Sequence, residues 1–268
     1  MAGAPPTFPP PGPADPDPLL TPWLDQITTG DCLTLLPHLP DQSVHLILAD
    51  LPYGTTRNKW DSIIDLPSLW AQYERVITAN GAIVLTAAQP FTSILVTSNL
   101  HLFKYEWIWA KTIGSGQLNI HHQPLRAHES VLVFYRKPPT YHPQMTSGDP
   151  YTIHRKASDW TDRGYNNQRD HTAANTGVRH PKTVLTIANP RITGGHPTQK
   201  PVDLFTYLIR TYTNPGDIVL DNVIGSGTTA VAAQRTGRHF IGMELDPGYA
   251  AAARARLADE PPTSPDEN

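Results

Sequence analysis

The sequence predicts an α/β fold with a mostly parallel central sheet. Two short apolar runs, Val44–Ala49 and Ile218–Leu220, each end at an aspartate, and a third, His239–Met243, ends at a glutamate. Such runs are typical of strands that are buried on both faces. Segments with apolar residues at helical spacing separate several of the predicted strands. Strands that alternate with helices run parallel, so the acids that follow them are expected at the ligand-binding edge of the sheet.

The first half of the chain alternates between strand and helix patterns. Leu66–Thr78 carries apolar residues at helical spacing and is expected to end at Asn80-Gly81. Tyr105–Trp109 alternates like a strand, and Glu129–Tyr135 is its expected antiparallel partner. The segment between them, Lys111–His128, is predicted to be a long functional loop. The other elements expected here are strands at 26–28, 44–49 and 82–86 and helices at 32–36 and 90–99.

The second half of the chain contains a predicted strand–helix–strand unit at 217–245. It is preceded by Pro201–Tyr212, which is expected to be a helix with proline in its first turn. A buried strand at 218–220 ends at Asp221 and leads to a glycine-rich turn at 225–229. The remaining expected elements are an alanine-rich helix to Thr236, a strand at 239–243 and a helix at 249–257.

Composition indicates one domain with an insertion and gives no global sign of the partner. The chain has 268 residues, is 39% hydrophobic and carries a net charge of −3. Its single cysteine, Cys32, excludes an internal disulfide framework and fits a reducing compartment. The proline-rich segment 1–22 does not resemble a signal peptide, and no later segment could span a bilayer, so we expect a cytoplasmic protein. We expect 23–258 to fold, and 1–22 and 259–268 to be disordered.

The stretch Asp50-Leu51-Pro52-Tyr53 follows a predicted strand and forms a stiff polar turn. Pro52 restricts its own backbone and disfavours a helical conformation at Leu51. The turn therefore fixes the Asp50 carboxylate, the Leu51 carbonyl and the Tyr53 ring relative to one another. Two acceptors beside an aromatic face suit a flat heterocycle that bears an amino group. The alternative interpretation is a simple strand exit with a half-buried tyrosine.

The glycine-rich turn Gly225-Ser226-Gly227-Thr228-Thr229 predicts a second binding element. Its small residues let the backbone approach a ligand closely, and Glu244 is placed to accept two ribose hydroxyls. The turn lacks the lysine of a phosphate-binding loop and the third glycine of the dinucleotide fingerprint. A nucleoside without a pyrophosphate fits better, and S-adenosylmethionine is the obvious candidate.

Residues 136–195 form a basic segment in a chain that is acidic overall. They contain nine Lys and Arg residues and four acids, a local net charge of +5, and their periodicity is poor. Tyr141, Tyr151, Trp160 and Tyr165 lie among the basic residues. Basic groups can neutralise phosphates and aromatic rings can stack on bases, so nucleic acid is one possible partner. A solvated surface insertion is the other interpretation.

Together these motifs resemble the amino-group DNA methyltransferases that use S-adenosylmethionine, over about 26–257. The resemblance implies a Rossmann-like class I methyltransferase fold, with a mostly parallel seven-stranded sheet, one antiparallel hairpin strand, and 136–195 as an inserted target-recognition region. The motif order is similar to the family's β-class, which suggests a homodimer. The matching segments are Gly30–Leu33, Asp50–Tyr53, Trp109–Lys111, His128-Glu129, His196–Pro201, Asp221–Thr229 and Gly242–Asp246.

The resemblance also implies roles for individual residues, although Leu51 replaces a proline of the family signature and Asn222-Val223 replaces a proline-phenylalanine pair. The residues expected to be catalytic are Asp50, Leu51, Pro52 and Tyr53. Those expected to bind the cofactor are Asp31, Cys32, Asp50, His196, Thr198, Lys200, Asp221, Asn222, Gly225, Ser226, Gly227, Thr228 and Glu244. Those expected to bind duplex DNA are Arg126, Arg155, Lys156, Arg163, Arg169, Arg179 and Lys182. In particular, Lys200 and Thr198 are expected to reach the methionine carboxylate of the cofactor.

Aspartate at the head of the signature favours adenine N6 as the methylated atom, and cytosine N4 is the alternative. A carbon-5 cytosine enzyme would need a cysteine nucleophile, and Cys32 lies beside Gly30-Asp31 rather than in a Pro-Cys pair. A non-catalytic DNA-binding module and a methyltransferase for RNA or small molecules are further alternatives. We expect no metal site, because His121 and His122 lack partners at ligand spacing. The sequence does not reveal whether a restriction enzyme accompanies the protein.

Overall fold

The computed structural model describes residues 18–54, 62–155, 170–190 and 199–260. The chain divides into two compact units. One, which we call the body, consists of the residues up to His142 and those from Thr183 onward. The other, which we call the ribbon unit, is Pro143–Lys182. The ribbon unit is shorter along the chain than the segment 136–195 that we assigned to target recognition.

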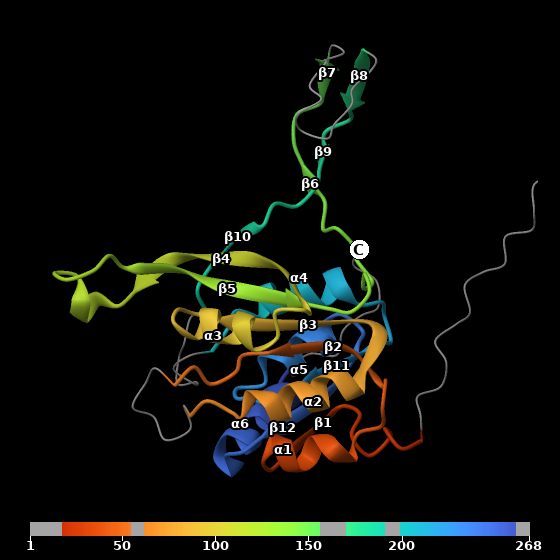
Figure 1. The fold of residues 1–268 in the computed structure, drawn as a ribbon, viewed down its shortest axis with the longest axis vertical. Coiled ribbons are helices and arrows are strands. Elements are labelled where there is room, and N and C mark those ends of the chain that lie inside the picture. Colours follow the sequence, from red (N-terminus) through yellow and green to blue (C-terminus); the bar gives the residue numbers. More distant parts are fainter. Residues whose placement is uncertain (1–17, 55–61, 156–169, 191–198, 261–268) are drawn as a thin grey trace, which may run out of the picture. The chain divides into compact units, whose positions relative to one another are not determined.

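The body is built on an eight-stranded sheet whose order is β1-β12-β11-β2-β3-β5-β4-β10 (Figure 1). Among the described strands of this sheet, only β5 runs antiparallel to its neighbours, as the sequence predicted. The eighth strand, β10, pairs parallel with β4, and its sequence lies within the segment that we had treated as an insertion. The strands are β1 (Gln26–Thr29), β2 (Val44–Ala49), β3 (Ile77–Ala87), β4 (Phe103–Ser115), β5 (Arg126–Phe134), β10 (Val184–Ile187), β11 (Ile218–Asp221) and β12 (His239–Glu244).

Helices cover both faces of this sheet, and each face has its own buried core. Alternation along β2 explains the two cores, because Ile47 belongs to the core under α1–α3 whereas Leu46 and Leu48 belong to the core under α4–α6. The helices are α1 (Cys32–Leu35), α2 (Leu66–Val76), α3 (Phe91–Ser98), α4 (Val202–Tyr212), α5 (Thr228–Arg235) and α6 (Pro247–Ala258), with short 3-10 turns η1 (Leu36–His38) and η2 (Gln117–Asn119).

The helix predicted over Leu66–Thr78 ends two residues earlier than expected. Strand β3 begins at Ile77 and contains Asn80-Gly81, which we had taken as the helix terminus. The pairing of β2 with β3 shifts register between Val44 and Leu46. At Gly81 a Cβ atom would lie 2.8 Å from the His45 carbonyl oxygen. The glycine therefore allows a close approach between strands at an irregularity in the ladder.

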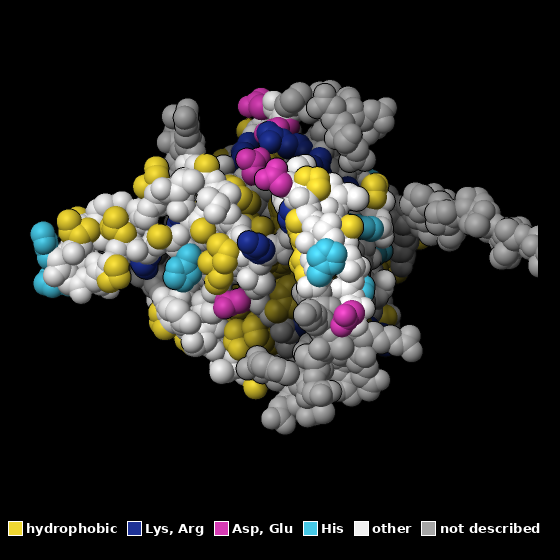
Figure 2. Space-filling model, turned by 90° about the horizontal axis from the view of Figure 1, so that it is seen from above, with side chains coloured by type: hydrophobic (Ala, Val, Ile, Leu, Met, Phe, Trp, Pro, Cys, Tyr) yellow, Lys and Arg dark blue, Asp and Glu magenta, His cyan; other side chains and the backbone are white. Residues whose placement is uncertain are grey.

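The hairpin formed by β4 and β5 is longer than predicted, which corrects the expected loop at 111–128. The strands extend to Ser115 and resume at Arg126, so the connection between them is much shorter. This connection exposes apolar side chains, including Leu118, which is 98% exposed, and Ile120, which is 54% exposed. Figure 2 shows hydrophobic and histidine side chains together at this end of the body.

The ribbon unit contains two short antiparallel ladders. Strand β6 (Thr146–Ser147) pairs with β9 (Val178–Arg179), and β7 (Tyr151–Arg155) pairs with β8 (His171–Asn175). Most of their described side chains are exposed. The guanidinium of Arg179 lies 4.5 Å from the centroid of the Tyr151 ring and donates hydrogen bonds to the Asn175 side chain and the Asp149 carbonyl.

The body extends beyond the predicted limits of 23–258. Residues 18–22 form turns, and Leu20 is only 2% exposed because it packs in the core under α1–α3. At the other end, Glu260 forms an ion pair with Arg235 at 2.7 Å. The predictions of disorder for 1–17 and 261–268 lie outside the described residues. Across the described part of the chain, no helix combines the length and apolar character needed to cross a membrane.

Candidate functional site

The acids that follow the parallel strands line one cavity of about 690 Å³. Asp50 follows β2, Asp221 ends β11, Glu244 ends β12, and Asp31 follows β1. These four strands are neighbours in the sheet, so their carboxyl ends lie at one edge. The volume is in the usual range for a small-molecule site. The structure thus places the Asp50 corner and the Gly225–Gly227 turn around one cavity, at the edge of the sheet where the acids were expected.

At the Asp50 corner, the carboxylate accepts hydrogen bonds on both oxygens. The Tyr53 hydroxyl donates to Oδ1 at 2.7 Å, and the Thr86 hydroxyl donates to the same oxygen. The Tyr53 ring stacks on Phe91 with a centroid distance of 5.3 Å. Burial, together with the charge of Asp50, raises the pKa of Tyr53 well above its usual value. Tyr53 therefore stays protonated and keeps its role as donor to Asp50.

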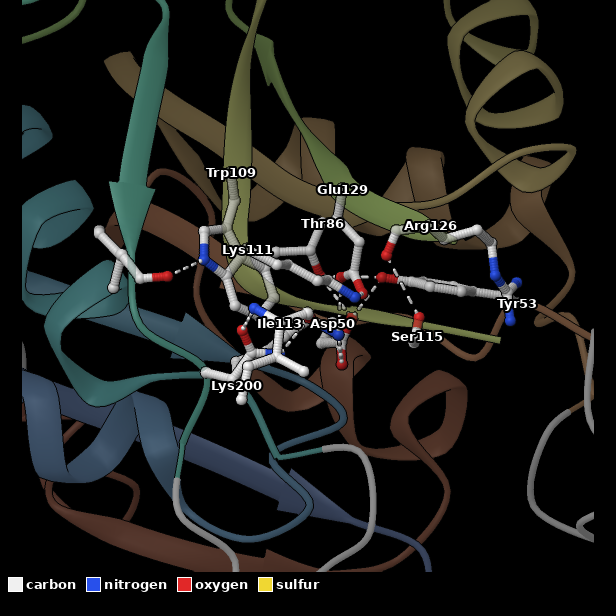
Figure 3. A network of polar contacts seen from close by, with 12 residues as sticks. Asp50, Tyr53, Thr86, Trp109, Lys111, Ile113, Ser115, Arg126, Glu129 and Lys200 are labelled. Carbon is white, nitrogen blue, oxygen red and sulfur yellow. Dashed lines mark hydrogen bonds and ion pairs between the residues drawn. The ribbon is translucent and has the colours of Figure 1, made fainter. Parts of the chain in front are cut away.

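Lys200 binds the second oxygen of Asp50 and connects it to a charged network of Glu129 and Lys111 (Figure 3). The Lys200 ammonium lies 2.7 Å from Asp50 Oδ2 and 3.2 Å from Glu129 Oε2, and Lys111 lies 2.5 Å from Glu129 Oε1. Burial opposes the charge on Lys200, but Asp50, Tyr53 and Glu129 outweigh it and raise the pKa of Lys200 well above its usual value. Lys200 is therefore a cation that faces two carboxylates.

Sequence analysis missed three members of this network. Thr86 ends the predicted strand at 82–86, and Lys111 and Glu129 lie in segments that matched the family without a role. For Lys200, which we expect at the cofactor carboxylate, the structure shows contacts of the ammonium with Asp50 and Glu129, and the contact with the cofactor stays a prediction. One signal was available for Lys111 and Glu129. The two strands were predicted to pair antiparallel, which brings Trp109-Ala110-Lys111 close to His128-Glu129.

Glu244 and the Gly225–Gly227 turn form a second part of the cavity wall, which we call the nucleoside corner. Backbone groups hold the Glu244 carboxylate there. Its Oε2 accepts from the Gly225 amide and its Oε1 from the Asp246 amide, both at 2.9 Å. Gly227 has a φ of +79°, a conformation that disfavours other residues, and a Cβ there would lie 3.1 Å from the Ala253 methyl. The turn therefore needs glycine at this position and presents the start of α5 to the cavity.

Asp221 and Asn222 support this corner from inside the fold. Asp221 accepts hydrogen bonds from the Val223 amide and the Thr229 hydroxyl, but burial raises its pKa to about 7. Asn222 accepts from the Tyr73 hydroxyl at 2.5 Å. Its Nδ2 is buried without a hydrogen-bond partner among the described residues. A buried donor of this kind on a cavity wall fits a ligand that carries acceptors.

The other predicted cofactor residues divide between the cavity and the undescribed segments. Asp31 caps α1 by accepting from the Leu33 amide at 2.7 Å and also lines the cavity, so capping is compatible with the predicted cofactor contact. Cys32 is buried there, and burial raises the pKa of its thiol. Ser226 and Thr228 line the same cavity. His196 and Thr198 lie outside the described residues.

The predicted DNA-binding residues are distributed over the body, the ribbon unit and the segments outside the described residues. Arg126 is exposed at the cavity, and Lys182 is exposed in the ribbon unit. Arg179 is engaged within the ribbon unit, as described above. Lys156, Arg163 and Arg169, and the side chain of Arg155, lie outside the described residues. Within the described part of the chain, no group of three potential metal ligands comes together.

Comparisons with known proteins agree with this geometry. The family model N6_N4_Mtase, described as DNA methylase, matches residues 44–255. DNA adenine methyltransferase YhdJ of Escherichia coli (strain K12) is 30% identical over 250 residues, which cover 86% of this chain and 82% of that protein.

Solved structures of DNA methyltransferases share the fold. The M1.HpyAVI–SAM complex is 25% identical with a TM-score of 0.60, and the match covers 87% of this chain and 99% of that one. The PvuII DNA methyltransferase (cytosine-N4-specific) is 19% identical with a TM-score of 0.62, over 87% and 86% of the two chains, which is a likeness of fold alone. These matches confirm the predicted resemblance and fold class: the chain belongs to the N6_N4 family of DNA methylases.

Proposed function

We propose that the protein methylates the exocyclic N6 of adenine in duplex DNA and takes the methyl group from S-adenosylmethionine. The observation that carries this proposal is that Asp50 and Glu244, which lie far apart along the chain, line one cavity. The aspartate that heads the signature supports adenine, as does similarity to a relative named as an adenine methyltransferase. Methylation of cytosine N4 by the same site is the alternative.

The residues of the cavity fit the proposed cofactor. Glu244 is oriented by two backbone amides, and an ionised carboxylate has further acceptor positions for the two ribose hydroxyls. Asn222 offers a buried donor, and Gly225 leaves space next to the backbone. When bound, S-adenosylmethionine supplies a methyl group on a sulfonium, which is already a good donor, so the protein's task is to position the acceptor.

The Asp50 corner is suited to the target amine, whose lone pair is delocalised into the ring of the base. Hydrogen bonds from the amine to Asp50 and to the Leu51 carbonyl favour a nitrogen with a localised lone pair. The base reaches these acceptors only after it leaves the duplex stack, and Tyr53, supported by Phe91, offers a surface for it to stack on. We assign no general base, because the nitrogen becomes acidic after methyl transfer and then loses its proton.

The ribbon unit is the proposed reader of the DNA sequence. Its exposed Lys182 can contact a phosphate, and its exposed ladders offer backbone and side-chain groups to the duplex. Arg126, at the cavity, can contact the DNA near the extruded base.

The homodimer remains a prediction from the resemblance, and the cytoplasmic location remains a prediction from composition. Sedimentation will test the homodimer.

Nucleoside digestion and mass spectrometry test the proposed reaction. Unmethylated genomic DNA is incubated with the protein and with S-adenosylmethionine whose methyl group is isotopically labelled. We expect the label in N6-methyladenine. Label found only in N4-methylcytosine would replace adenine by cytosine, and label found in RNA but not in duplex DNA would change the substrate class.

A further inference from the structure

The carboxylate proposed to accept the target amine already has donors on both oxygens. Tyr53 and Thr86 donate to Oδ1 of Asp50, and Lys200 donates to Oδ2 at 2.7 Å. Tyr53 and Thr86 belong to the framework of the corner. The Tyr53 side chain is held by Asp50 and by stacking on Phe91, and Thr86 is a fully buried residue of β3. Lys200 is therefore the donor whose departure would make an acceptor position available.

Lys200 also lies next to the aromatic surface that the base would use. Its ammonium is 5.5 Å from the centroid of the Tyr53 ring. The lysine thus contacts both the acceptor and the stacking surface assigned to the target base. A base that binds to Asp50 and Tyr53 has to compete with the Lys200 ammonium for these positions.

A second anion is available to the displaced ammonium. Glu129 Oε2 lies 3.2 Å from Lys200, and the side chains of Lys200 and Glu129 are 7% and 13% exposed. Glu129 is itself held by Lys111 at 2.5 Å, so it stays fixed if Lys200 moves. A buried charge without a partner is costly, and Glu129 allows Lys200 to leave Asp50 without becoming unpaired.

We propose that Glu129 is a positioning residue that holds the Lys200 ammonium when the amino group of the target base takes its place on Asp50. This inference rests on the proposed function, because it assigns Asp50 to the target amine. Without Glu129, the ammonium has Asp50 as its remaining carboxylate partner in the described network and competes more strongly with the base. Glu129 thereby acts on catalysis through Lys200 and does not touch the reacting atoms.

The first test is Glu129→Gln, which keeps the shape of the side chain and removes its charge. We expect kcat to fall about tenfold or more, while the dissociation constant of S-adenosylmethionine changes less than about twofold. Glu106→Gln is the matched control, because Glu106 lies on the same hairpin and is exposed. We expect this control to keep wild-type kcat. Thermal unfolding of each variant reports whether it folds.

The second test is Lys200→Met, alone and combined with Glu129→Gln. If Lys200 competes with the base, the double variant has a higher kcat than Glu129→Gln alone, and Lys200→Met alone also keeps more kcat than Glu129→Gln. A structural role of the ion pair would not produce this recovery. If Lys200 instead binds the cofactor carboxylate, Lys200→Met weakens S-adenosylmethionine binding and the double variant shows no recovery, which would overturn the proposal.

The proposed function and the positioning role of Glu129 are contradicted by different results. A wild-type protein that transfers no methyl group to any DNA would overturn the proposed function and this inference with it. An active wild type whose Glu129→Gln variant keeps the same kcat would overturn the positioning role alone. If Glu129→Gln fails to fold, the variant Lys200→Met still shows whether Lys200 competes with the base or binds the cofactor. A higher dissociation constant of S-adenosylmethionine, or a kcat reduced tenfold or more, counts against the proposal.

Discussion

The Asp50 corner of the body and the ribbon unit are organised in opposite ways. Asp50 follows β2, whose residues from Leu46 to Ala49 are fully buried, and its carboxylate is held by several donors. The ladders of the ribbon unit have mostly exposed side chains, and two-stranded ladders are marginally stable by themselves. Chemistry requires groups that are oriented in advance, whereas contact with a long charged duplex requires reach and charge. Substitutions in the two regions should therefore change different quantities.

The largest effect is expected at the Asp50 corner. Asp50→Ala removes the proposed acceptor of the target amine, and loss of one such electrostatic contact lowers kcat roughly 10²–10³-fold. Binding to duplex DNA should stay close to that of the wild type, because Asp50 is proposed to contact only the target base and the proposed contacts of Lys182 and Arg126 are retained. Single-turnover methyl transfer and a DNA-binding titration measure the two quantities. Unchanged methyl transfer would remove Asp50 from the mechanism.

A pH-dependent effect on stability is expected from Asp221. Its pKa is about 7 in the folded protein, against 3.8 for an aspartate in an unfolded chain, so between about pH 4 and pH 7 the folded state binds more protons than the unfolded state. Its contribution to the free energy of unfolding is therefore present at low pH and is lost as the pH rises through about 7. The loss amounts to at most about 4 kcal/mol.

The variant Asp221→Asn does not titrate at this position and isolates the contribution. Denaturant unfolding of both proteins from pH 4 to pH 8 should show the wild type losing stability relative to the variant as the pH rises. A difference between the two proteins that stays constant over this range would contradict the burial argument. The exposed ribbon unit offers no comparable buried acid among its described residues.

A smaller effect is expected at the nucleoside corner. Glu244→Gln keeps the shape of the side chain and removes its charge, and a hydrogen bond to a charged group contributes about 1.5–3 kcal/mol. The dissociation constant of S-adenosylmethionine should therefore rise about 10–100-fold, which calorimetry can measure. Glu106→Gln, at an exposed position of β4, should leave this constant unchanged. Equal binding by both variants would exclude Glu244 as the ribose acceptor.

The smallest effect is expected in the ribbon unit. Lys182→Ala should weaken DNA binding only a few-fold, and it should lower the slope of log affinity against log salt by about 1 if the lysine contacts one phosphate. Cofactor binding should not change. Lys104→Ala, an exposed lysine of the body, serves as the control. An unchanged salt slope would place Lys182 outside the DNA contact and weaken the assignment of the ribbon unit.

Local patterns predicted the parts of the site that depend on neighbours in sequence. An apolar run followed by Asp50, and a strand followed by Glu244, are recognisable because a buried strand has a short and distinct pattern. The boundary between α2 and β3 was not predictable in the same way. Asn80-Gly81 is typical of a helix end, but here the approach of the His45 carbonyl requires the glycine within a strand.

The sequence by itself determined the α/β class, the acids at the strand ends and the glycine-rich turn, because these features arise from local periodicity and backbone preference. Only the tertiary structure decided that Lys200, 150 residues from Asp50, lies on its carboxylate together with Glu129 of the hairpin. It also decided that β10 joins the sheet beside β4. Such contacts depend on the order of strands in the sheet, and pairing between distant strands leaves no local pattern in the chain.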